Sequence, residues 1–253
     1  MSGVVEGQSK YVRFIIVCAG RCGSSLLRSL LNSHRRIVAF GEIFGNGDKI
    51  GWDLPGYSQN HKILTLFRAN PSEFLKKRVF GKYPIGIGAV GFKFIYAHKN
   101  LSSWKSLGSF IKNERRFQII HLKRRNILRS YLSLLTAFQT NQWFNHTGVQ
   151  AIIVPITINY DHCLRFFKKT RAGEAYFDTF FAKHPKIEVI YENLVSEQRL
   201  ETKRIQSFLG TDYEHLFTSV YKQARLPLSK AIANYTSLKR NFKGTPWQVF
   251  FED

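Results

Sequence analysis

Runs of apolar residues alternate along the chain with segments in which apolar positions recur every three to four residues. The first pattern predicts buried strands, and the second predicts helices that turn one face toward a core. Strands are predicted at 11–19, 85–98, 117–122 and 187–191, with a shorter apolar run at 37–44. Helices are predicted at 24–32, 71–80, 101–113, 124–138, 159–182 and 199–209. This alternation predicts an α/β fold with a central, mostly parallel sheet flanked by helices.

Two segments lack this periodicity and predict irregular structure. Residues 45–61 are rich in Gly, Asp, Asn and Pro, and residues 225–253 predict loops and a short helix. The sequence has no internal repeat and no Pro- or Ser-rich linker that would divide it. A single domain is therefore expected over 1–253, with residues 1–10 flexible.

The composition is that of a folded domain with a strong basic excess. Hydrophobic residues make up 44% of the 253 positions, which is enough for a sizeable core. Lys and Arg number 38 against 17 Asp and Glu, so the formal net charge is +21. This excess predicts anionic partners such as nucleotide phosphates, nucleic acid or acidic lipid, although a basic surface that serves solubility alone fits as well.

Cysteine usage and the N-terminal residues bear on the compartment. Cys18, Cys22 and Cys163 have no regular spacing, which argues against a disulfide framework and favours a reducing compartment. The first residues lack the apolar core of a signal peptide, and no apolar run approaches the ~20 residues of a membrane span. A soluble, cytoplasmic protein is expected. No His, Cys, Asp or Glu cluster has the spacing of a metal site, so no metal is predicted.

The segment AGRCGSSLL, which joins the first strand to the first helix, carries the strongest functional signal. Gly20 and Gly23 allow a tight turn that aims backbone N–H groups at a ligand, and the helix start favours an anion. Ser24 and Ser25 add hydroxyl donors, and Arg21 adds a permanent charge. These residues fit a phosphate site, and they fit equally a plain turn in which a serine caps the helix.

Two observations narrow the choice of phosphate compound. The loop lacks the lysine and the glycine spacing of G-x-x-x-x-G-K-[ST], which weakens the case for an ATP or GTP site. After the strand at 117–122, Arg125 and Asn126 precede Ser133 in the segment HLKRRNILRSYLSL. If a helix starts near Asn126, Arg125 and Ser133 flank its first two turns and can meet at one tetrahedral anion. A solvated helix face is the alternative interpretation.

Together these segments resemble the sulfotransferase family that uses 3′-phosphoadenosine 5′-phosphosulfate (PAPS), in its bacterial carbohydrate branch of nodulation and lipopolysaccharide type. The loop GRCGSSLL, the R-N-x₆-S pattern and the tail NYTSLKRNFKGTPWQVFFED are the most specific parts. FGEIF, GAVGFKFIYAH and VIYENLV also resemble family segments, so the resemblance runs from about Phe14 to the C-terminus. It implies the P-loop-like sulfotransferase fold. Cys22 departs from the usual Ser or Thr, and residues 45–88, which match no family segment, are assigned to the acceptor side.

The resemblance implies a donor site at these segments. The loop would bind the 5′-phosphosulfate, and the R-N-x₆-S pattern would bind the 3′-phosphate. The residues expected to bind PAPS are Gly20, Arg21, Cys22, Gly23, Ser24, Ser25, Arg125, Ser133, Tyr191 and Lys243. Among these, Tyr191 is the adenine contact and Lys243 a weaker candidate for the 3′-phosphate. Arg21 is also expected to act in catalysis, at the leaving phosphate oxygen.

Three further residues are candidates for the chemistry at the acceptor. The resemblance points to Glu42 as the general base, and burial after the apolar run 37–44 is expected to raise its pKa. Pairing with an arginine, or capping a turn, is the structural alternative for Glu42. His98 is the alternative base, because histidine titrates near neutral pH. Lys93 is expected to reach the sulfuryl oxygens or else to extend to solvent.

The predicted function is sulfuryl transfer from PAPS, without a metal, to a hydroxyl of a carbohydrate or glycolipid-type acceptor. A P-loop-like nucleotide kinase and a non-enzymatic polyanion or nucleic-acid binder are the alternatives. The kinase would need a loop lysine and Mg²⁺-binding acids, and the binder would need clustered basic residues, whereas Lys and Arg are spread along the chain.

The partners follow from this function only in part. No specific nucleic acid is expected, an anionic membrane is a candidate for peripheral contact, and the oligomeric state is open. The tryptophans are candidates for stacking on a sugar, and no spacing selects among Trp52, Trp104, Trp143 and Trp247.

Overall fold

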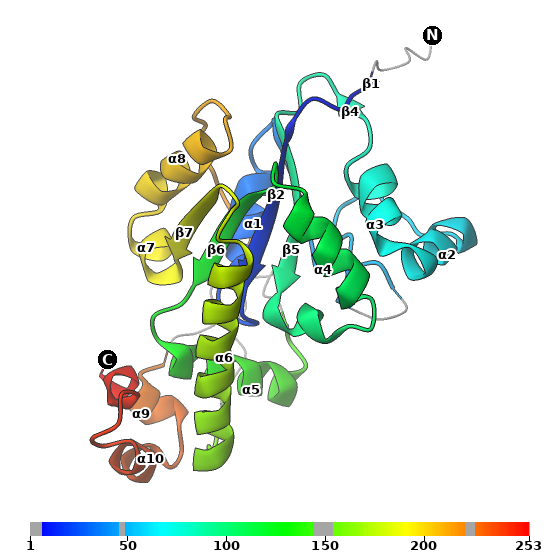
Figure 1. The fold of residues 1–253 in the computed structure, drawn as a ribbon. Helices are drawn as coiled ribbons and strands as arrows, with labels where there is room; N and C mark the ends of the chain where they lie inside the picture. Colours follow the sequence, from blue (N-terminus) through cyan, green and yellow to red (C-terminus); the bar gives the residue numbers. More distant parts are fainter. Residues whose placement is uncertain (1–6, 46–48, 144–153, 221–225, 253) are drawn as a thin grey trace.

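A five-stranded parallel sheet forms the centre of the protein (Figure 1). The computed structural model describes residues 7–45, 49–143, 154–220 and 226–252. The strands lie in the order β3-β5-β2-β6-β7, with bounds Ile37–Phe40 (β3), Ala89–Ile95 (β5), Val12–Cys18 (β2), Gln118–Lys123 (β6) and Lys186–Ile190 (β7). Every pairing in this sheet is parallel, which confirms the predicted α/β fold.

The central position of β2 explains its sequence. β2 pairs with β5 along one edge and with β6 along the other. All of its side chains from Phe14 to Cys18 are fully buried, because helices cover both faces of the sheet. A strand buried on both faces has no solvent side that polar residues could mark, and β2 therefore reads as the continuous apolar run FIIVC.

Helices cover the two faces of the sheet and form a further group beyond its end (Figure 1). One face packs on α1 (Ser24–Asn32), α7 (Tyr191–Ser196) and α8 (Gln198–Phe208), and the other packs on α4 (Trp104–Asn113) and α6 (Tyr160–Phe180). A separate apolar cluster joins α6 to α5 (Ile127–Thr140), α9 (Leu228–Ala231), α10 (Tyr235–Asn241) and the 3₁₀ turn Gln248–Phe251. This cluster borders the carboxyl ends of the strands, where ligands bind in such sheets.

Most predicted helices are present, and α2 (His61–Ala69) and α7 add to them. α2 was not expected from the sequence; it begins where Asn60 Oδ1 accepts a hydrogen bond from the N–H of Ile63, at 3.0 Å. The helix predicted at 71–80 consists of two shorter pieces, α3 (Pro71–Phe74) and a π-helical turn (Leu75–Val79).

One predicted strand is shorter than expected, and the first described residues form a strand of their own. The strand predicted at 85–98 ends early, because the His98 ring accepts a hydrogen bond from the N–H of Ile95 (3.3 Å) and Tyr96–Asn100 wind into a 3₁₀ turn. Gly7–Gln8 form a short strand, β1, that pairs with β4 at Tyr83–Pro84, and the flexibility expected of residues 1–10 stays a prediction. Residues 1–6 lie outside the described part of the chain.

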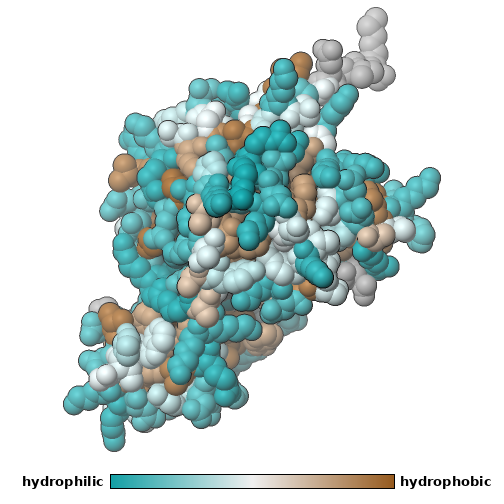
Figure 2. All heavy atoms as spheres, viewed as in Figure 1, coloured by the Kyte–Doolittle hydropathy of each residue, from teal (hydrophilic) through white to brown (hydrophobic). Residues whose placement is uncertain are grey.

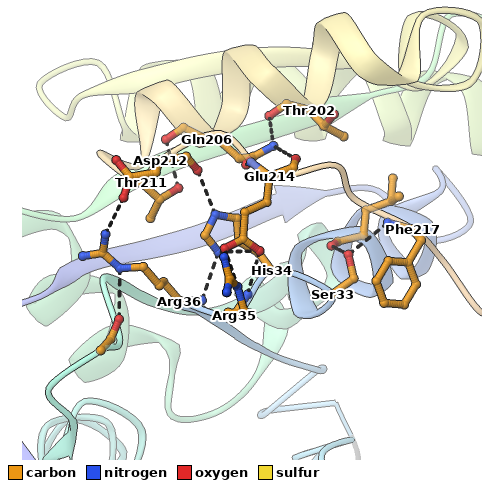
Figure 3. A network of polar contacts seen from close by, with 12 residues as sticks. Ser33, His34, Arg35, Arg36, Thr202, Gln206, Thr211, Asp212, Glu214 and Phe217 are labelled. Atoms are coloured by element: carbon orange, nitrogen blue, oxygen red, sulfur yellow. Dashed lines mark hydrogen bonds and ion pairs between the residues drawn. The ribbon is translucent and has the colours of Figure 1, made fainter.

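A polar network at the amino end of the sheet holds the segment after α8 against the turn between α1 and β3 (Figure 3). His34 is 2% exposed, and its Nε2 lies 2.9 Å from the carbonyl oxygen of Asp212. Arg36 Nη1 pairs with the Asp212 carboxylate at 2.7 Å, and Arg35 Nε pairs with Glu214 at 3.0 Å. These contacts anchor the carboxyl end of α1, whose amino end carries the candidate phosphate site.

Hydrophilic residues cover most of the face drawn in Figure 2, and the apolar residues between them are scattered. This is the surface expected of a chain with a large charge excess. Among the described residues, no helix has both the length and the apolar character needed to cross a bilayer.

The close approach of β2 and β5 gives a stability prediction. A Cβ at Gly91 would overlap the ring and the carbonyl oxygen of Phe14, so we expect Gly91→Ala to lower the free energy of unfolding by roughly 1–3 kcal/mol or more. A Cβ at Gly86 would meet nothing within 4 Å, so Gly86→Ala is the matched control and should stay within about 0.5 kcal/mol of the wild type. Urea unfolding measures both changes, and equal values for the two variants would contradict the prediction.

Candidate active site

The loop between β2 and α1 has the geometry of an anion site. Arg21 and Gly23 both adopt left-handed backbone conformations, with φ of 61° and 96°. A Cβ at Gly23 would also overlap the ring of Tyr191, so glycine is required there on two grounds. Gly23 is the residue that precedes α1, no side chain caps the helix, and its first turn has no acidic residue. The serine cap considered from the sequence is therefore absent, and the first N–H groups of α1 are available to an anion.

Cys22 and Ser24 turn their side chains away from the space outside the loop. Cys22 is 1% exposed and packs in the core beside Cys18, with which it shares a hydrogen bond. Ser24 is 5% exposed and its hydroxyl also contacts Cys18. The replacement of the usual hydroxyl residue by Cys22 thus places a thiol in the core, and Ser25 is the more accessible of the two serines.

Arg21 links the loop to α5. Its Nε and Nη2 donate hydrogen bonds to Ser133 Oγ at 3.2 and 3.0 Å, and its Nη1 donates to the carbonyl oxygen of Trp143 at 2.7 Å. Arg124 lies beside it, donating from Nη1 to the carbonyl oxygen of Arg21 at 3.1 Å. Burial and the charge of Arg124 lower the pKa of Arg21. An anion placed between these two guanidinium groups would offset both effects.

The start of α5 agrees with the sequence analysis, but the predicted pair does not meet in this structure. Asn126 caps α5, accepting from the N–H of Arg129 at 3.0 Å. Arg125 Nη2 donates to Asn193 Oδ1 at 2.9 Å, whereas Ser133 accepts from Arg21. Among the described residues no hydrogen bond joins Arg125 to Ser133, so their joint contact with a 3′-phosphate stays a prediction.

Tyr191 and Lys243, the other two predicted donor contacts, differ in their setting. Tyr191 begins α7, is 8% exposed, and lies under the guanidinium of Arg124, which is 4.6 Å from its ring centroid. Its ring therefore packs directly against the backbone of the loop at Gly23. Lys243 follows α10 on the surface, and within the described residues its side chain makes no hydrogen bond to the loop.

Glu42, Lys93 and His98 come together because β3 and β5 are neighbouring strands. Glu42 follows β3 in a tight turn, in which Gly45 N–H donates to the Glu42 carbonyl at 2.8 Å. Lys93 of β5 is 3% exposed, and its Nζ lies 2.8 Å from Glu42 Oε1. His98 Nε2 lies 3.7 Å from Glu42 Oε2. The carboxylate thus pairs with a lysine and not with an arginine, and Lys93 does not extend to solvent.

The pKa of Glu42 is shifted in the direction opposite to the expected one. Burial raises it, as expected, but the contact with His98 and the charge of Lys93 outweigh burial and lower it to about 2. Glu42 is therefore ionised throughout the physiological range. The expectation of a raised pKa was wrong because it considered burial without the cationic partners that β5 supplies.

The hydrogen bond to Ile95 defines the role that His98 can take. Its Nδ1 accepts from the N–H of Ile95 at 3.3 Å, so the neutral ring carries its proton on Nε2. Nε2 is buried and has no partner within hydrogen-bond distance, and it faces the carboxylate of Glu42. In this tautomer His98 can donate toward Glu42 but cannot accept a proton at Nε2, which favours Glu42 as the base.

Two arginines near the site were missed in the sequence analysis. Arg124 precedes Arg125 directly and contacts the loop, so its position next to the R-N pair was an available signal. Arg28 of α1 is 17% exposed and donates to the carbonyl oxygen of Asp53 at 2.8 Å. Burial lowers the pKa of Arg28, and Asp53 and Glu42 act in the opposite direction. Arg28 lies four residues after Ser24, on the same side of the helix.

The described residues contain no group of three or more His, Cys, Asp or Glu side chains that could hold a metal ion. The site is therefore built from backbone N–H groups, guanidinium groups and one lysine–carboxylate pair. Such a set can hold a doubly charged anion at the loop and can orient a hydroxyl next to Glu42.

Comparison with known proteins assigns the class. A family profile described as "Sulfotransferase family" matches residues 13–215 of the chain. The chain belongs to the sulfotransferase family, and it is an enzyme that transfers sulfuryl groups. This assignment sets aside the nucleotide kinase and the polyanion binder that the sequence analysis left open.

Individual relatives indicate the branch and the fold. Nodulation protein H of Rhizobium tropici is 25% identical over 247 residues, covering 94% of this chain and 92% of that protein. Nodulation protein H of Rhizobium meliloti (strain 1021) is 24% identical over 254 residues, covering 94% of each chain. A sulfotransferase structure from Alicyclobacillus acidocaldarius aligns with a TM-score of 0.52 and 13% identity, over 94% of this chain and 93% of that one. The bacterial sulfotransferase family and its fold are thereby confirmed.

The ion pair of Lys93 predicts how Glu42 titrates. In the wild type, the Glu42 carboxyl should titrate at a pKa of about 2. Lys93→Met removes the positive charge and leaves burial, so the pKa of Glu42 should rise. Lys76→Met is the control, because Lys76 pairs with the exposed Glu73 at 2.8 Å and should leave Glu42 unchanged. Carbon-13 NMR of the glutamate carboxyls measures the shift, and an unmoved Glu42 in Lys93→Met would contradict the geometry.

Proposed function

We propose that this sulfotransferase takes its sulfuryl group from PAPS and transfers it to a hydroxyl of a carbohydrate or glycolipid-type acceptor. The observation that carries the proposal is the position of Arg21, between the start of α1 and Ser133 of α5. It brings the two segments expected to hold the 5′- and 3′-phosphates within one side chain of each other. The nodulation proteins among its relatives support the carbohydrate branch.

The residues present fit the nucleotide. The uncapped start of α1 offers N–H donors to the 5′-phosphosulfate, and Gly20 has open space where a side chain would stand. Arg21 and Arg124 would neutralise the phosphate. The 3′-phosphate would compete for the Ser133 hydroxyl that Arg21 now holds, with Arg125 as its second contact. Tyr191 remains the proposed adenine contact and Lys243 the weaker 3′-phosphate candidate.

The chemistry assigns a task to each charged group. Negative charge grows on the bridging oxygen as the sulfur–oxygen bond breaks, and Arg21 together with the loop N–H groups would stabilise that charge. Lys93 orients Glu42 through their ion pair at 2.8 Å, and we assign to it a contact with the sulfuryl oxygens as well. Glu42 would accept the proton of the acceptor hydroxyl. The hydroxyl becomes strongly acidic as its oxygen bonds to sulfur, so a carboxylate suffices at that stage.

The proposed compartment follows from the free cysteine thiols, and the proposed membrane contact follows from the net charge. We keep the cytoplasm as the compartment, because Cys18, Cys22 and Cys163 are free thiols. Contact with an anionic membrane is kept as the proposal that the net charge of +21 supports.

The 3′-phosphate assignment is tested by comparing two nucleotides. Arg125→Ala should weaken binding of adenosine 3′,5′-bisphosphate by roughly 1.5–3 kcal/mol and hardly change binding of adenosine 5′-monophosphate. Arg116→Ala is the matched control, because Arg116 pairs with Glu114 at the other end of β6. Calorimetry measures the affinities, and an equal loss of affinity for both nucleotides in Arg125→Ala would refute the assignment of Arg125 to the 3′-phosphate.

The base is tested by transfer of labelled sulfate from PAPS into a panel of glycan and glycolipid acceptors. Glu42→Gln should lower turnover by roughly 10²–10⁴-fold, because it cannot take a proton, while nucleotide affinity stays unchanged. Since the pKa of Glu42 is about 2, the wild type should show no acidic limb from this residue above about pH 3. A near-normal Glu42→Gln combined with an inactive His98→Asn would make His98 the base.

A further inference from the structure

The structure distinguishes one tryptophan from the other three. Trp52 is 6% exposed in the core, and Trp104 and Trp247 pack against the apolar clusters. Trp143, which follows α5, is 39% exposed. Trp104 and Trp247 are only partly buried, and Trp143 is the most exposed of the four tryptophans.

Trp143 is part of an exposed aromatic pair. Phe138, in the last turn of α5, is 66% exposed, and its ring centroid lies 5.2 Å from that of Trp143 at an interplanar angle of 82°. Edge-to-face packing of this kind holds both rings in place. The two residues, Phe138 and Trp143, are called the aromatic platform below.

The platform adjoins the phosphate loop. Arg21 donates to the carbonyl oxygen of Trp143 at 2.7 Å, and its guanidinium carbon lies 5.9 Å from the centroid of the Trp143 ring. The residue that we assign to the leaving oxygen therefore touches the platform directly. A molecule stacked on Trp143 would be within one side chain of the sulfuryl group.

We infer that Phe138 and Trp143 form a stacking site for a pyranose ring of the acceptor, which positions a hydroxyl toward the loop at Arg21. The inference rests on the proposed function and names the part of the chain that recognises its acceptor. A sugar ring presents apolar C–H groups on its faces and hydroxyls on its rim. It therefore matches an aromatic surface that borders a cationic, hydrogen-bonding site.

The size of the platform favours a small ring over a protein surface. A stable protein interface covers roughly 800 Å² on each partner, far more than two aromatic side chains provide. The other large apolar side chains that are exposed in the described residues, such as Phe217 and Leu200, lie on other elements. Binding of a second copy of the chain to the platform is the alternative that the experiment must distinguish from binding of a sugar.

Tryptophan fluorescence tests the stacking without requiring turnover. Acrylamide quenches exposed tryptophans, so Trp143, the most exposed of the four, should contribute a part of the wild-type quenching that is lost in Trp143→Phe. With adenosine 3′,5′-bisphosphate present, tetrasaccharides of glucose, galactose and N-acetylglucosamine are added in turn, and at least one should reduce the quenching. Trp143→Phe should abolish this response. If none of the saccharides protects Trp143, the inference is overturned.

Kinetics with the best saccharide acceptor supply the second test. Trp143→Ala should raise the acceptor KM about tenfold, or about 1.4 kcal/mol, because stacking is lost. Its Kd for adenosine 3′,5′-bisphosphate should change much less than the acceptor KM, since the hydrogen bond from Arg21 goes to the backbone carbonyl of residue 143, which the substitution keeps. The acceptor KM of Trp143→Phe should lie between those of the wild type and Trp143→Ala. Phe217→Ala is the control, because Phe217 is 67% exposed and lies near Ser33, at the opposite end of α1.

The outcomes separate this inference from the proposed function. If the wild type neither binds the nucleotide nor transfers sulfate from PAPS, the proposed function is refuted. The fluorescence test then still decides whether the platform binds a saccharide. An acceptor KM in Trp143→Ala within twofold of the control overturns the platform. So does a change in sedimentation that shows the wild type, but not Trp143→Ala, associating through this surface.

Discussion

The buried charge of Lys93 is the constraint on which the site depends. Lys93 is 3% exposed and stands opposite Ile16 of the central strand. An ammonium group taken out of water needs a partner, and Glu42 supplies it at 2.8 Å. The N–H of Lys93 also donates to the carbonyl oxygen of Gly41 at 3.1 Å. The turn after β3, an edge strand, is thereby held beside the loop after β2.

The site has more cations than carboxylates: Glu42 pairs with Lys93, and Glu192 lies 3.9 Å from Arg124. Arg21 and Arg124 adjoin each other, and Lys93 already occupies Glu42. Without an anion, Arg21 is satisfied by the neutral hydroxyl of Ser133 and the carbonyl of Trp143. These are weaker partners than a phosphate, because charged hydrogen bonds are roughly twice as strong as neutral ones. The same side chain can therefore serve the α5 contacts in one state and a bound anion in another.

The sequence could predict the features that depend on residues close together in the chain, and not those that depend on contacts between distant segments. The sheet, the loop and the start of α5 depend on local patterns, namely apolar runs, turn glycines and the capping residue Asn126. The contact of Arg21 with Ser133 spans 112 positions, and the fold alone brings the two together. The predicted direction of the pKa shift of Glu42 was wrong for the same reason, since its partner Lys93 comes from another strand. α2 has local signals, namely the capping residue Asn60 and the apolar residues at 63, 64, 66 and 67. It was missed because it directly follows a Gly- and Pro-rich segment that predicts a loop.

The low pKa of Glu42 bears on its proposed role as the base. Lys93 and His98 are the groups that lower it, so any anion that draws the Lys93 ammonium away weakens one of the two causes. The oxygens of a sulfuryl group would be such an anion, and the pKa of Glu42 would rise from about 2 when the donor is in place. The carboxylate would then be a stronger proton acceptor with the donor bound than without it. Under the proposed function, a buried lysine shared between the carboxylate and the donor would make Glu42 most basic in the complex in which a proton must be taken.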